Sequence, residues 1–250
     1  ILHVVLAAFF TYHLARQTAA LGRAGALGAG ITFAFSGFFA AQAGHVNQLS
    51  AAVWLPLMLL LFDRAYKRRS VVNTMLCGVV IGLTLLAGHT QETYMTLCAL
   101  GGFFVWQSAG GTRRALNLHA PPGRNAAQSV VLAARMLASA ARANLRGIAT
   151  LLLALLVGAG LAAIQLAPSL ELAGLSIRAG GLGYRQVVSF SLNPLILPQA
   201  LLPGYWQNPF SEYVGFVGVT GLLLAILGAV THWRHPQTGF FVVLAGVGFC

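Results

Sequence analysis

The chain has 250 residues, of which 58% are hydrophobic and only 8% are charged. Soluble domains carry about 25% charged residues, so this composition excludes an ordinary soluble fold and predicts an all-α, polytopic bundle of transmembrane helices. A formal charge of +11 would suggest nucleic-acid binding in a soluble chain. In this chain the basic residues instead follow the pattern of a membrane protein, as described below.

A membrane-spanning helix needs about 20 mostly apolar residues, and the chain contains about eight such runs. The first and last are truncated: the sequence begins at Ile1 without a methionine and stops at Cys250, both inside apolar runs. We therefore interpret residues 1–250 as a single transmembrane domain from a longer protein. The predicted membrane segments are residues 1–15, 24–41, 49–66, 71–88, 92–107, 147–167, 214–231 and 238–250. The glycines of GALGAG at 25–30 predict close helix packing in the second segment.

The basic residues alternate from one connection to the next. Thirteen of the 15 lysines and arginines follow the first, third, fifth and seventh segments, while the other connections hold only Arg178 and Arg185. Those other connections also contain three of the four acidic residues, namely Glu92, Glu171 and Glu212. Because cytoplasmic loops carry the excess of Lys and Arg, we predict that the basic connections are cytoplasmic and that the chain does not bind nucleic acid.

Two similar polar stretches, AGHVNQ at 43–48 and AGHTQETY at 87–94, follow the second and fourth segments. Both therefore lie at the outer ends of helices, beside very short turns. Polar groups near the hydrocarbon boundary are costly unless they face protein or a wet cavity. The repeated pattern predicts one shared outer site, although a single histidine at a helix end has an equally simple structural role. The residues expected in this site are His45, Gln48, His89, Gln91 and Glu92.

Two long connections differ in composition. Residues 108–146 begin with a Gly- and Pro-containing loop and continue in a helix-compatible stretch with arginines at 135, 142 and 146. We predict a cytoplasmic basic loop with an interfacial helix, whose basic stripe faces anionic membrane lipids. Residues 168–213 are too apolar for a solvated linker, and their prolines exclude one long helix. We predict an outer loop with short interfacial helices, in which Glu171 and Arg178 form an ion pair or contribute to the outer site.

Four stretches resemble successive segments of the bacterial YfhO-type membrane proteins, which are similar to GT-C class glycosyltransferases. The stretches are AGHVNQLSAAVWLPLMLLL, LLAGHTQETYMTLCAL, AAIQLAPSLELAGLSIRAGGLGYRQVVSFSLNPLILPQALLPGYW and EYVGFVGVTGLLLAIL. The resemblance implies a GT-C-like fold in the bacterial cytoplasmic membrane. It also implies an enzyme that transfers a sugar from a polyprenyl-phosphate donor, at the outer face, to an envelope glycan or lipid acceptor.

The resemblance suggests roles for particular residues. It carries over to His45, His89, Gln91, Glu171, Ser176 and Arg178, and Arg185 lies nearby in the same outer loop. Arginine binds phosphate in a bidentate manner, so Arg178 is expected to hold the donor phosphate. The catalytic acid of GT-C enzymes lies in a large outer loop that would precede Ile1, which leaves Glu92 and Glu171 as weak local candidates for the base.

The sequence does not determine whether the protein uses a cofactor. No zinc-binding or nucleotide-binding motif occurs, and the resemblance leaves a requirement for a divalent cation undecided. The alternative function is a transporter or lipid-handling protein, in which the same polar residues would bind a substrate in transit.

Overall fold

The structure, a computed structural model, describes residues 1–250 except 117–125, 177–178, 189–200, 203–213, 234 and 249–250. All regular elements in the described ranges are helices, which confirms the predicted all-α class. The helices are α1 (Leu2–Gln17), α2 (Arg23–Ala34), α3 (Gly37–Ala41), α4 (Val46–Ala52), α5 (Leu55–Arg68), α6 (Val71–Leu86), α7 (Thr90–Leu116), α8 (Ala126–Leu161), α9 (Ala163–Leu175), α10 (Tyr184–Val187), α12 (Val219–His232) and α13 (Pro236–Gly248).

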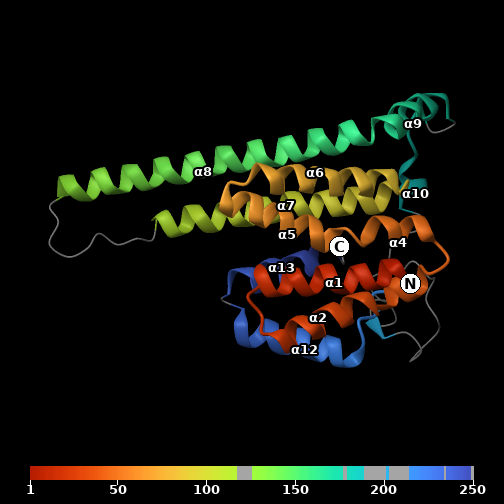
Figure 1. The fold of residues 1–250 in the computed structure, drawn as a ribbon, viewed down its shortest axis with the longest axis horizontal. Coiled ribbons are helices and arrows are strands. Elements are labelled where there is room, and N and C mark those ends of the chain that lie inside the picture. The colour runs from red at the N-terminus through yellow and green to blue at the C-terminus, as the bar shows by residue number, and fades with distance from the viewer. Residues whose placement is uncertain (117–125, 177–178, 189–200, 203–213, 234, 249–250) are drawn as a thin grey trace.

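The main helices run side by side along the long axis of the molecule (Figure 1). The α1–α2, α5–α6 and α12–α13 connections lie at one end of the bundle, and the α6–α7 turn lies at the opposite end (Figure 1). We call the first the basic end, because it carries Arg16 and Arg23, the cluster Lys67, Arg68 and Arg69, and the arginines of α8. The opposite end contains both AGH stretches, and we call it the polar end.

Helix α5 forms the centre of the bundle. Five consecutive side chains, Met58 to Phe62, are at most 5% exposed, and a helix that is apolar on all sides is a buried one. It packs against α1, α6, α7 and α8. Pro56 lies in its first turn, where the absent backbone N–H of proline costs no helical hydrogen bond. The predicted 49–66 segment is therefore two helices, α4 and α5, that meet near Trp54.

Small residues bring α6 and α8 close together. A Cβ atom added to Gly78 would lie 2.6 Å from Val157 Cβ, and one added to Gly158 would lie 2.5 Å from Ile81 Cγ2. Such close backbone approach is typical of membrane helices that associate through small residues. The glycine prediction for 25–30 is confirmed at Gly30, where an added Cβ would lie 2.7 Å from the carbonyl oxygen of Ala8 in α1.

Helix α8 corrects the predicted organisation of residues 108–146. Instead of a loop with a separate interfacial helix, α7 continues to Leu116, and α8 is one helix from Ala126 to Leu161. The basic stretch is thus coaxial with the apolar stretch that follows it, and it projects past the basic end of the bundle (Figure 1). The stretch TRRALNLHAPPGRN contains the only prolines near this region, and residues 126–146 lack Gly and Pro, so nothing interrupts the helix before the apolar half.

In the part of the chain that the structure describes, three helical stretches are long and apolar enough to cross a membrane, namely Arg23–Ala41, Val46–Arg68 and Ala134–Leu161. Large apolar side chains are also exposed on the outside of the bundle, for example Leu156 at 69%, Leu223 at 62% and Val230 at 70%. Soluble monomers rarely expose apolar surface on this scale. Among the described residues, Val71–Leu86, Val219–His232 and Pro236–Gly248 are apolar helices of shorter length.

The described part of the predicted outer loop contains two short helices, α9 and α10. Helix α9 continues from the end of α8 after a break at Ala162, and every described residue from 167 to 176 is exposed. The rest of the loop, including Arg178, lies outside the described residues.

Candidate functional site

The two AGH stretches meet at the polar end of the bundle. The Gln48 side-chain amide, in α4, lies 3.2 Å from Nε2 of His89, which immediately precedes α7. These residues are 41 positions apart in the sequence. Because α4 packs against both α6 and α7, the hydrogen bond joins two separate parts of the bundle.

His89 occupies the N-cap position of α7. The backbone N–H of Glu92 donates to His89 Nδ1 over 3.4 Å, and the N–H of Thr93 donates to the His89 carbonyl oxygen over 3.2 Å. The side chain therefore satisfies one of the backbone donors that every helix leaves free at its N-terminus. The histidine has the structural role of a helix cap, and at the same time its other ring nitrogen contacts α4.

These contacts define the proton position on His89. A neutral imidazole has one donor and one acceptor nitrogen. Since Nδ1 accepts from Glu92, the proton is on Nε2, and both bonds form together when the Gln48 amide is turned so that its oxygen faces the ring. The two ends of an amide have nearly the same shape, so the hydrogen-bond network decides its orientation. With the nitrogen toward the ring, Gln48 Oε1 is buried and has no hydrogen-bond partner among the described residues.

Two further histidine pairs lie near this end. His45 Nδ1 donates to Oε1 of Gln42 over 2.8 Å, and Gln42 is only 3% exposed. On the other side of α4, Ser50 Oγ lies 3.1 Å from Nε2 of His3. The His3 pair was not expected from the sequence, because Ser50 is 47 residues away and nothing in either local stretch indicates the contact.

The other predicted site residues are less closely grouped. Gln91 and Glu92 lie in the first turn of α7, with Gln91 exposed and Glu92 partly buried. Glu171 is exposed on α9, and Arg185 is exposed on α10. The predicted pairing of Glu171 with Arg178 falls on a residue outside the described ranges. The structure thus brings Gln48 and His89 into contact and places His45 with Gln42 instead of with His89.

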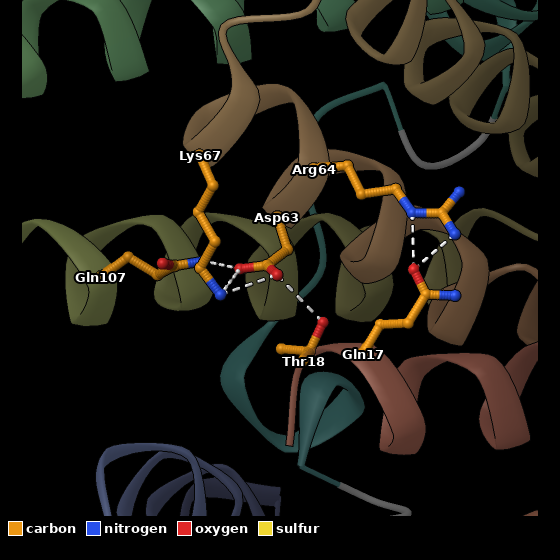
Figure 2. Close-up of polar contacts among 6 residues, drawn as sticks. All are labelled: Gln17, Thr18, Asp63, Arg64, Lys67 and Gln107. Carbon is orange, nitrogen blue, oxygen red and sulfur yellow. Dashed lines mark hydrogen bonds and ion pairs between the residues drawn. The ribbon is translucent and has the colours of Figure 1, made fainter. Parts of the chain in front are cut away.

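A second polar cluster lies at the basic end and was not predicted. Its centre is Asp63 of α5, which is 4% exposed. The carboxylate accepts from Thr18 Oγ1 at 3.1 Å, from Lys67 Nζ at 2.9 Å and from Gln107 Nε2 at 2.6 Å. Figure 2 shows these three donors converging on the carboxylate from the end of α1, from α5 and from α7.

An adjacent contact strengthens the same junction. Arg64 donates to the side-chain oxygen of Gln17 from two of its nitrogens, with Nε at 2.9 Å, and Figure 2 shows this pair beside the Asp63 cluster. A buried carboxylate is very costly unless it is paired and fully hydrogen-bonded. Asp63 has both an ion pair and several hydrogen bonds, which offset the cost of burying it within an apolar helix.

Sequence reasoning missed Asp63 because it adjoins a basic turn and was counted with that turn. The available signal was an acidic residue directly after LPLMLLLF with a lysine four positions later. An ionisable residue inside an apolar segment is a candidate functional residue with an expected partner. The partners Thr18 and Gln107 are 45 and 44 residues away, so only the fold could identify them.

No three His, Cys, Asp or Glu side chains gather closely enough to hold a metal ion in the part of the chain that the structure describes. No family model matches the chain, and no curated protein or solved structure shows significant similarity to it.

Proposed function

We propose that this chain is the membrane-embedded core of a GT-C-like glycosyltransferase, with about eight membrane segments and its basic end in the cytoplasm. The polar end then lies at the outer face of the bacterial cytoplasmic membrane. There it would bind a polyprenyl-phosphate-linked sugar and an envelope glycan or lipid acceptor. The observation that carries this proposal is the hydrogen bond between Gln48 and His89, which joins both AGH stretches at the end opposite to the basic residues.

The chemistry of sugar transfer requires the groups that collect at this end. The acceptor hydroxyl attacks the anomeric carbon, the bond from that carbon to the phosphate oxygen breaks with its electron pair on the phosphate, and the acceptor proton passes to a carboxylate. Donors that face the departing phosphate stabilise the charge that develops there. In this proposal the Gln48 amide, held in place by His89, supplies such a donor, and Arg178 and Arg185 supply positive charge.

The carboxylate is the less defined part of the proposal. Glu92 lies one turn into α7, next to His89, and is therefore better placed than Glu171, which is exposed on α9. From the resemblance to GT-C enzymes, we expect the main catalytic acid to precede Ile1. Glu171 is then a residue that orients Arg178.

The test is transfer of labelled sugar from polyprenyl phosphate, measured in membranes that contain the full-length protein. The double variant Gln48→Leu, His89→Ala should lose at least tenfold in rate, because one charge-assisted donor alone contributes about 1.5–3 kcal/mol and 1.36 kcal/mol corresponds to a factor of ten. His232→Ala is the matched control, since this exposed histidine lies at the basic end. Unchanged transfer by a well-expressed double variant would refute the site.

A second function, transport of a substrate or handling of lipid, is supported by a different observation. The buried Asp63 lies within an apolar helix and bonds to side chains of three helices, and ionisable residues at such positions often mark transport pathways. Reconstituted vesicles distinguish the two functions. Substrate flux that requires Asp63 and occurs without sugar transfer would favour the transporter.

A further inference from the structure

One face of α8 is basic in its first half and apolar in its second half. With about 100° between successive residues, Arg135, Arg142, Arg146, Leu153 and Leu156 fall within about 80° of one another. All five are exposed, Leu153 at 38% and Leu156 at 69%. Along this one face of α8, positively charged side chains are thus followed, toward the Leu161 end, by apolar side chains.

The positions of these residues along the helix axis can be measured from Gly147, where α8 contacts the bundle. A Cβ added to Gly147 would lie 2.6 Å from Tyr66 Cε2 and 2.5 Å from Phe104 Cε2, so α8 is in tight contact with the bundle there. At a rise of about 1.5 Å per residue, Arg146 and Arg142 lie about 1.5 and 7.5 Å beyond that level, and Arg135 about 18 Å beyond it. The headgroup layer on each side of a bilayer is about 5–7.5 Å thick. Arg146 and Arg142 are therefore at headgroup depth if Gly147 marks the hydrocarbon boundary.

Arg142 and Arg146 differ from Arg64 and Lys67 of α5. Lys67 bonds to Asp63, and Arg64 bonds to Gln17. Within the described ranges, no hydrogen bond or ion pair engages Arg142 or Arg146. Their guanidinium groups are available for an external anion, and guanidinium is well suited to phosphate.

We propose that this face of α8 binds an anionic phospholipid of the leaflet at the basic end. The lipid phosphate lies between Arg142 and Arg146, and an acyl chain follows Leu153 and Leu156. Charge complementarity and the continuity of the basic and apolar halves on one face argue for a lipid. The inference rests on the membrane-crossing part of the proposed function and is independent of sugar transfer.

A competing ligand is a soluble anion one to two turns farther out. An open hollow of about 530 Å³ is lined there by Ala134, Arg135, Ala138, Ser139 and Arg142. Such an anion would use Arg135 and Arg142, whereas a phospholipid would use Arg142 and Arg146. Arg135 therefore distinguishes the two ligands.

The experiment places the full-length protein in nanodiscs of phosphatidylcholine and phosphatidylglycerol, and native mass spectrometry measures the phosphatidylglycerol that is retained after extraction. Each arginine near an anionic surface should contribute about fivefold in affinity, so Arg142→Gln, Arg146→Gln should weaken retention about 25-fold. Two controls match this variant. Arg68→Gln, Arg69→Gln removes the same charge at the same end but from α5 and its turn, and Arg135→Gln removes charge from the same face beyond the headgroups.

Because Arg142 and Arg146 contact the lipid phosphate directly in this proposal, their double variant should lose clearly more retention than either control, whose arginines attract anionic lipid only through general charge. Equal losses in the two double variants would overturn it in favour of general charge attraction. A loss with Arg135→Gln as large as with Arg146→Gln, together with competition by free glycerophosphate, would assign a soluble anion to the hollow. Unchanged retention, or a change of oligomeric state with no change of lipid, would also overturn it. Failure of the protein to enter nanodiscs would instead contradict the membrane-crossing assignment itself.

Discussion

The two polar clusters, at opposite ends of the same bundle, are built in different ways. At the basic end, the buried carboxylate of Asp63 receives donors from Thr18, Lys67 and Gln107. At the polar end, Gln48 and His89 share one hydrogen bond, and one atom of the Gln48 amide is buried with no partner among the described residues.

This difference separates two uses of polar residues inside an apolar bundle. A fully satisfied network holds helices in fixed positions and has little capacity left for a ligand. A partly satisfied pair contributes less to stability but keeps hydrogen-bonding capacity for another molecule. The basic end therefore has the properties of a structural junction, whereas the polar end keeps the hydrogen-bonding capacity that the proposed site requires.

The largest expected effect is at the junction. Asp63→Ala should lower the free energy of unfolding by about 3 kcal/mol, because it removes the shared acceptor of three donors and leaves the partly buried Gln107 amide and the buried Thr18 hydroxyl without this partner. Thermal or chemical unfolding in detergent measures this loss.

Asp63→Asn is the matched control for that variant. It keeps one carbonyl acceptor and the side-chain volume but removes the charge, so about half of the stability should return. A wild-type unfolding curve for Asp63→Ala would show that the network does not hold the helices together.

A smaller effect is expected at the helix cap. His89→Ala should cost about 1 kcal/mol of stability, the usual value for loss of an N-cap side chain. His89→Asn should restore this stability, since asparagine is a good N-cap residue, but its shorter side chain cannot keep the contact with Gln48. Unfolding measurements together with the transfer assay separate the cap from the site: equal activity of His89→Asn and wild type would mean that His89 acts only as a cap.

The smallest change in stability is expected for Gln48→Leu. The substitution approximately conserves volume, and it removes an amide that is only partly satisfied, so the free energy of unfolding should change by less than about 0.5 kcal/mol. Activity or ligand binding at the polar end should nevertheless fall. A loss of stability above about 1.5 kcal/mol would place Gln48 with the structural junction and remove the contrast between the two ends.

The sequence contained much of this arrangement. Alternation of charge between connections predicted that both AGH stretches lie at one end, and apolar run lengths predicted an all-helical chain. Helix boundaries were harder. The 49–66 run gives no periodic break at Trp54, and the start of α5 is marked only by Pro56. For α8, a basic stretch without Gly or Pro was interpreted as a separate surface helix, although the same lack of breakers permits one continuous helix.

The contacts within each cluster depend on tertiary structure. Thr18 lies at the end of α1, Asp63 in α5 and Gln107 in α7. A polar residue at each of these positions is common near the end of an apolar run, so the sequence around it gives no sign of the contact. His89 contacts Gln48 of the AGHVNQ stretch. The contact is possible because segments 49–66 and 71–88 cross the bundle in opposite directions and return the chain to the polar end. His45 instead bonds to Gln42, because a partner three residues away in a helix-terminal turn is closer than any partner on a neighbouring helix.

The length of α8 has a mechanical consequence. Its 36 residues correspond to a rod about 54 Å long, and it is in tight contact with the bundle at two levels, Gly158 and Gly147. From Gly147 to Ala126 the helix continues for a further distance of about 32 Å. A small tilt of this arm about Gly147 would move Ala126 much farther than Arg146, which lies next to the contact. An anion held at Arg142 and Arg146 would therefore restrain the arm close to its base.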